Sequence, residues 1–169
     1  MSQDSLRTII LGSINPNDPE FINYQRYLDE FRQQNPQKLV EDLIIVTKDS
    51  EIPYQILFIS LVLIKHCFND SRSPINKENL ILQSSFPIEL ILQLFDISFA
   101  CFNHPETSVR NVSIELFSNI AITQQSNISV LGIDQRLLEM IDESHSIHQR
   151  LSSIQCIFNL FLFHNFSEE

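Results

Sequence analysis

Residues 18–47 read DPEFINYQRYLDEFRQQNPQKLVEDLIIVT, and this stretch decides the fold. Pro19 and Pro36 each follow a residue type that commonly caps the start of a helix, Asp18 and Asn35. Proline is favoured in the first turn of a helix because its missing N–H has no partner there. After each proline, apolar residues recur at helical spacing: Phe21, Tyr24, Leu28 and Phe31, then Leu39, Leu43 and Val46. The stretch therefore predicts two consecutive helices.

The same punctuation extends along the rest of the chain. Pro53, Pro87 and Pro105 each precede a further apolar run, and no stretch shows the sustained alternation of a strand. Two later stripes have helical spacing: Val109, Val112, Leu116, Phe117 and Ile120, then Ile147, Leu151, Ile154, Phe158, Phe161 and Leu162. On the first of these helices, Ser118 and Asn119 are among the residues predicted to face away from the core. We expect helices at 4–14, 18–34, 36–49, 53–69, 87–102, 105–123, 134–142 and 146–164.

Helices of similar length in a regular row favour an all-α fold. Their pairing at a period of about 35–40 residues is typical of a HEAT- or armadillo-like solenoid (an α-α superhelix). We expect about four antiparallel helix pairs in one domain over 1–169, with a loop at 71–86 and further helix pairs over 87–169. The helix at 53–69 is apolar almost all round and should be the most buried. A compact helical bundle is the alternative fold.

Composition excludes several classes of function. The 169 residues include 11 Lys and Arg against 21 Asp and Glu, a net charge of −10. Nucleic-acid binding needs a basic surface that replaces phosphate counterions, and an anionic membrane would repel this chain, so we expect neither partner. The two glycines cannot build a Gly-rich phosphate loop.

No residue pattern points to catalysis or to a bound metal. The three cysteines, Cys67, Cys101 and Cys156, form no disulfide framework and no Cys-x-x-Cys pair, and buried free cysteine usually packs as a small hydrophobe. The helical pair His145 and His148 supplies too few ligands for zinc. We therefore expect no catalytic residue, no metal and no cofactor.

Residues 6–70 carry the marks of a known family. An apolar helix (6–14) and an acidic turn (17–20) are followed by Leu28 and Phe31, then by Asn35-Pro36 and the apolar run 39–46. The next long helix ends in Ile64-Lys65-His66-Cys67-Phe68. This order resembles the N-terminal domain of importin-β-type nuclear transport receptors (karyopherin-β). The run 105–110, in which Val-Arg precedes Ile120-Ala121 by about ten residues, is similar to the HEAT pattern of that family.

The resemblance implies protein binding rather than catalysis. Its N-terminal arch binds the GTP-bound small GTPase Ran in nuclear transport, so it implies a chain that works in the cytoplasm and nucleus with Ran and other transport proteins. Polar residues on the second helix of each pair would face the GTPase: Gln25, Asp29, Lys65 and Glu115. Arg110 stands at a marked family position and would either bridge repeats or contact the partner.

The sequence also departs from the family pattern. Leu57 stands where the family has an Arg, Ser60 where it has an Ala, and His66 where it has an Asn, and the chain has no Trp. These departures leave two alternatives open. One is a HEAT or armadillo scaffold without Ran binding, and the other is a small helical enzyme or regulator with an unrecognised site.

Aromatic residues gather near the C-terminal end of the chain: Phe158, Phe161, Phe163 and Phe166. A solenoid needs a polar capping repeat, because otherwise its last apolar face stays in water. Such a stripe can indicate a further repeat, self-association or a partner helix. The more usual arrangement, which we expect here, is packing of the stripe back onto the preceding helices.

Overall fold

The computed structural model describes residues 3–68, 86–124 and 132–166, and in these ranges the protein is all-α, with eight helices and no strand. The helices are α1 (Gln3–Gly12), α2 (Phe21–Gln34), α3 (Pro36–Thr47), α4 (Tyr54–His66), α6 (Ile88–Cys101), α7 (Thr107–Thr123), α8 (Ile133–Glu139) and α9 (Ile147–Phe166). All eight predicted helices are confirmed, with ends that agree to within three residues. The predicted loop at 71–86 lies, except for Phe86, outside the described residues.

The prolines mark helix starts in three different ways. Pro36 is the first residue of α3, as predicted, whereas Pro53 and Pro87 occupy the position just before α4 and α6. After Pro19 the helix starts two residues late. The Asp18 carboxylate accepts a hydrogen bond from the Glu20 N–H (2.8 Å), and this local turn places the start of α2 at Phe21. Asn35 caps α3 through its backbone alone, since its side chain makes no capping hydrogen bond.

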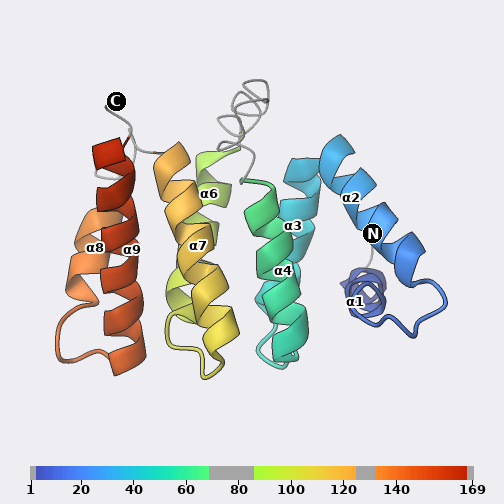
Figure 1. The fold of residues 1–169 in the computed structure, drawn as a ribbon, viewed down its shortest axis with the longest axis horizontal. Helices are drawn as coiled ribbons and strands as arrows, with labels where there is room; N and C mark the ends of the chain where they lie inside the picture. Colours follow the sequence, from blue (N-terminus) through green and yellow to red (C-terminus); the bar gives the residue numbers. More distant parts are fainter. Residues whose placement is uncertain (1–2, 69–85, 125–131, 167–169) are drawn as a thin grey trace. The chain divides into compact units, whose positions relative to one another are not determined.

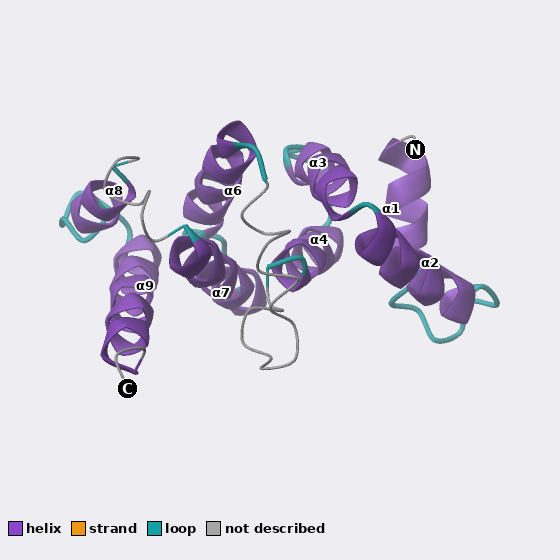
Figure 2. Ribbon diagram, turned by 90° about the horizontal axis from the view of Figure 1, so that it is seen from above, coloured by secondary structure: helices purple, strands orange, loops and turns teal. Residues whose placement is uncertain are grey.

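The chain divides after Cys67 into two compact units, residues 1–67 and 68–169, which are described separately here. The prediction of one domain over 1–169 stays a prediction. In the first unit each helix packs on the next, and α1 also packs on α3 and α4 (Figures 1 and 2). The core contains Leu6, Ile10, Leu28, Leu39, Leu43, Val46, Leu61 and Ile64.

The second unit has an aromatic core. The helix α7 packs on α6 and on α9, and α8 packs on α9 (Figure 1). The buried ring of Phe117 on α7 lies 5.0 Å from Phe95, 5.3 Å from Phe99 and 5.9 Å from Phe102, between ring centroids. Tilted and edge-on pairs of this kind contribute roughly 0.5–1.5 kcal/mol each beyond the area they bury. Phe117 therefore anchors α7 to α6.

Two predictions about burial are wrong. The most buried helix in the described residues is α7, with ten buried residues, rather than α4, with five. Ser118 and Asn119 on α7, predicted to face away from the core, are buried. The reason is that α7 is covered on two sides, by α6 and by α9, so its buried face is wider than its apolar stripe.

The direction in which the apolar stripe of α9 faces also differs from the prediction. Its six residues (Ile147, Leu151, Ile154, Phe158, Phe161 and Leu162) are exposed, so the expectation that Phe158 and Phe161 pack onto the preceding helices is wrong. The side chains of Phe163 and Phe166 lie outside the described part of the structure. The buried side of α9 consists of Ser152, Ser153 and Cys156. Small side chains let α9 approach α7 closely, and this close approach turns the large apolar residues outward.

Candidate functional site

The five residues predicted to bind a partner fall into the two units. Gln25 and Asp29 lie on α2 and Lys65 lies on α4, all in the first unit. Arg110 and Glu115 lie on α7 in the second unit. Whether any of them contacts a partner stays a prediction.

Gln25 and Asp29 share the outward face of α2, one helical turn apart. Both are exposed, whereas the neighbouring Leu28 is buried. The Gln25 side-chain amide donates to the backbone carbonyl of Ser13 (3.2 Å), which ties α2 to the turn after α1. The Asp29 carboxylate lies 3.5 Å from the Arg32 guanidinium, an exposed pair of low stabilising value. Both side chains therefore present polar groups to solvent on one face.

Ile22 lies on this same face and was not among the predicted residues. Ile22 lies one turn before Gln25 and Arg26 and is 66% exposed. An exposed apolar side chain ringed by polar ones is a common arrangement at the centre of a protein contact. The helical spacing could have indicated that Ile22 is exposed, because it lies outside the stripe of Phe21, Tyr24, Leu28 and Phe31 that packs inward. We name Ile22, Gln25, Arg26 and Asp29 the α2 outer face.

Lys65 lies half-buried in the last turn of α4, followed by His66. A cation in this position interacts favourably with the negative end of the helix dipole. Both α2 and α4 pack on α3, so α3 lies between the two helices that carry the predicted residues of the first unit. Lys65 therefore stabilises its own helix whatever else it does.

Arg110 holds the start of α7. Its Nη1 donates to the backbone carbonyls of His104 (2.7 Å) and Pro105 (2.8 Å), and its Nη2 donates to Oγ1 of Thr107 (2.8 Å). The planar guanidinium suits this arrangement because its donors point in fixed directions. Five residues further along α7, Glu115 is exposed. Arg110 therefore has a structural role at the start of α7, and its part in partner contact stays a prediction.

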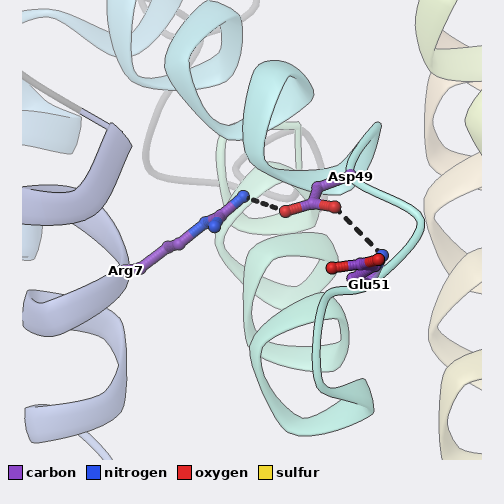
Figure 3. Close-up of polar contacts among 3 residues, drawn as sticks. All are labelled: Arg7, Asp49 and Glu51. Atoms are coloured by element: carbon purple, nitrogen blue, oxygen red, sulfur yellow. Dashed lines mark hydrogen bonds and ion pairs between the residues drawn. The ribbon is translucent and has the colours of Figure 1, made fainter.

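Charged residues outside the predicted set also form ion pairs. Arg7 on α1 pairs with Asp49, whose other oxygen accepts from the Glu51 N–H at 3.0 Å (Figure 3). The Glu51 bond first, and Arg7 second, lower the pKa of Asp49 below its usual range. On α3, the hydrogen bond from Lys38 to Asp42 (2.8 Å) raises the pKa of Lys38. These contacts fix local geometry within the first unit.

Arg136 makes a further pair, in the second unit. Its Nη1 lies 2.8 Å from a carboxylate oxygen of Asp96, and its guanidinium carbon lies 4.3 Å from the centre of the Phe99 ring. A cation over an aromatic face is stabilised by the ring's quadrupole. Arg136 thus joins α8 to α6, 40 residues apart in sequence.

The thiols of the second unit are held protonated. Burial raises the pKa of Cys101 to about 11, and burial raises that of Cys156 further, against a smaller opposing effect of Ser118. A thiol attacks as its thiolate, so neither side chain is a nucleophile at neutral pH. Among the described residues no group of three or more His, Cys, Asp or Glu could hold a metal ion. Within those same ranges no helix is both long and apolar enough to cross a membrane.

Exposed apolar side chains also line one face of α9. Ile147, Leu151, Ile154, Phe158, Phe161 and Leu162 are all exposed, and we name them the α9 seam. Their spacing was visible in the sequence, but their outward direction was not. In comparisons with known proteins, no family model matches the chain, and no curated protein matches it either.

Proposed function

We propose that the chain is a protein-binding module of HEAT-type helix pairs, and that its partner is the GTP-bound form of the small GTPase Ran. The observation that carries the helical-repeat part is the packing of matching helices from successive pairs. In the first unit α1, the first helix of its pair, packs on α3, the first helix of the next. In the second unit the second helices α7 and α9 pack on each other. In helical-repeat proteins, equivalent helices of successive repeats pack on each other and bury a continuous core.

One departure from the importin-β-type pattern, Ser60 on α4, is compatible with the resemblance. Ser60 stands where that family has a small Ala, and its side chain is completely buried. A serine has nearly the same bulk, so it keeps the close helix contact that the small residue allows. Leu57, at the position of the family's Arg, is also buried and apolar, and this departure favours the alternative of a HEAT scaffold without Ran binding.

The α2 outer face is the surface we assign to the GTPase. It lies on the second helix of the first pair and combines an exposed apolar residue, Ile22, with the exposed polar residues Gln25, Arg26 and Asp29. The net charge of −10 favours a partner with a basic surface and accelerates their encounter. In this proposal the chain works by binding, without catalysis, in the cytoplasm and nucleus.

The test is binding of the purified chain to Ran, loaded in parallel with GTP and with GDP, at about 0.15 M salt. We expect affinity for the GTP form to exceed that for the GDP form by at least about tenfold. Asp29→Lys, combined with Ile22→Ala, should weaken GTP-form binding by a further factor of about ten. Glu143→Lys, an equal charge reversal at an exposed site between α8 and α9, is the matched control and should leave binding within about twofold.

The outcomes separate the parts of the proposal. Absence of binding to either form removes Ran as the partner. If the double variant (Asp29→Lys with Ile22→Ala) and the control Glu143→Lys lose binding equally, the effect is due to net charge. The α2 outer face is then removed as the site. An experimental structure in which α1 does not pack on α3, or α7 does not pack on α9, overturns the helical-repeat part.

A further inference from the structure

The α9 seam has the spacing of a coiled-coil contact. Ile147, Leu151, Ile154, Phe158 and Phe161 follow one another at steps of four, three, four and three residues. This alternation is the heptad pattern, which keeps the contact line of one helix facing a partner helix over several turns. Leu151, Ile154 and Phe158, the central three, are 56%, 48% and 53% exposed. A strict heptad line in solvent is a surface shaped for another helix.

The opposite side of α9 packs within its own unit. Ser153 and Cys156 are completely buried, and the Ser152 hydroxyl donates to the backbone carbonyl of Phe102 (3.4 Å). The Asn159 amide donates to Oγ of Ser118 on α7 (3.1 Å). Rotating α9 to bury the seam would break these bonds and place large side chains where only small ones fit. The seam therefore stays outward in the folded unit.

We propose that a second copy of this chain covers the α9 seam, so that two α9 helices pair in a homodimer. A heptad line is self-complementary, because each of its side chains fits between those of an identical line on a two-fold related helix. This inference does not depend on Ran binding, which we assign to a different helix, α2.

The exposed area is sufficient for such a dimer. At about 200 Å² of full area for each side chain, the six residues of the seam leave roughly 600 Å² of apolar surface in water. That equals the largest apolar patch on a typical monomer, which is about 300–600 Å² and often functional. Two copies together would bury at most about 1,200 Å², which is the lower limit for a stable, specific interface. Interfaces of this size are typical of weak association, so we expect an affinity in the micromolar range.

The charge along α9 favours a copy of itself. The chain carries a net charge of −10, yet its sequence from Ile147 to Phe166 contains no Asp or Glu. Two seams can approach without acidic side chains opposing each other, which is the main repulsion expected between two such acidic chains. The Arg150 side chain beside the seam already donates to the backbone carbonyl of Ile141 (3.1 Å) within its own unit.

The experiment is sedimentation equilibrium of the full chain from about 5 to 200 µM, the range that brackets the expected affinity. We expect the average mass to rise from 19.7 kDa toward twice that value. Phe158→Glu should abolish this rise, because it places two carboxylates across the contact line. Phe158→Leu, which keeps an apolar seam, should retain the dimer. Leu138→Glu, at an exposed apolar residue of α8 outside the seam, is the matched control and should also retain it.

Circular dichroism of each variant confirms that it is folded, and exposed positions are not expected to change helical content. A wild-type chain that stays monomeric throughout the concentration range overturns the proposal, whatever other helix then binds the seam. Retention of the dimer in Phe158→Glu overturns it too. Loss of the dimer in Leu138→Glu to the same degree as in Phe158→Glu also overturns it, because self-association would then not be specific to α9.

Discussion

The side chains of Arg7 and Asp49 form an ion pair that joins α1 to the turn following α3 (Figure 3). The two residues are 42 positions apart, and no local pattern links them. Asp49 also accepts from the Glu51 N–H, so its carboxylate closes the turn while it holds α1. One acidic side chain thus couples α1, in the first helix pair, to the turn between the two helices of the second pair.

This carboxylate makes the stability of the first unit depend on pH. The folded protein lowers the pKa of Asp49. The stabilisation by the ionised carboxylate is therefore present above the pKa of the unfolded state, about 4, and is lost as pH falls through the pKa of the folded state. Asp49→Asn should lower Tm near neutral pH and flatten the fall in Tm on acidification. Arg7→Ala should flatten it only in part, because the larger cause, the Glu51 hydrogen bond, remains. Thermal melts at several pH values check both variants, and an unchanged pH profile in Asp49→Asn contradicts the assignment.

Gly12 ends α1 at a point of close approach to α2. A Cβ built at Gly12 would lie 2.3 Å from two ring carbons of Tyr24, well inside any allowed contact. Gly12→Ala should therefore destabilise the protein by about 1–3 kcal/mol, although alanine is the better helix former. In a Tyr24→Ala background the clash is gone, and Gly12→Ala should then be neutral or stabilising by about 0.5–1 kcal/mol. Urea unfolding of the four proteins measures this coupling, and equal effects of Gly12→Ala in both backgrounds would refute it.

The sequence predicted the helices well because its signals are local. Proline at Pro36, Pro53 and Pro87 and the apolar spacing after each act within one or two turns, and the structure confirms the helices that they start. What the sequence could not supply is the direction in which a helix turns its faces. On α9 the apolar stripe implied an inward face, yet the contact with α7 is made by Ser152, Ser153 and Cys156. That choice depends on the shape of a helix far away in sequence.

The candidate site shows the same division. Asp29 and Glu115 are exposed, as residues outside an apolar stripe should be. Ile22 also lies outside its stripe, and it was missed because apolar residues are assumed to be core. The hydrogen bonds of Arg110 to the turn before α7 could not be foreseen, since they depend on the path of the backbone at His104 and Pro105.

Arg110 provides a test that separates folding from partner binding. Arg110→Ala removes three hydrogen bonds from the turn before α7 and should lower the free energy of unfolding by about 1–3 kcal/mol. Arg110→Lys keeps the charge but lacks the planar fork, so it should recover only part of this loss. Urea unfolding gives the stabilities, and Ran binding is measured on the folded fraction. If both variants unfold like the wild type while binding is lost, Arg110 acts in partner contact and its hydrogen bonds to the turn contribute nothing.

The three cysteines should differ sharply in their reaction with a thiol reagent. Cys67, at the end of α4, is half-buried, whereas Cys101 and Cys156 are buried. Because the pKa of Cys101 is about 11 and burial raises that of Cys156 as well, even a buffer of about pH 9 leaves both almost entirely protonated. Cys67 should react first in the native protein, and the other two should react only as the second unit unfolds. Peptide mapping after brief alkylation checks this order.

Rapid modification of Cys156 in the native chain would show that the Ser152, Ser153 and Cys156 side of α9 is open to solvent. The outward direction of the seam would then have to be reassigned, since the helix cannot present both faces to its own unit.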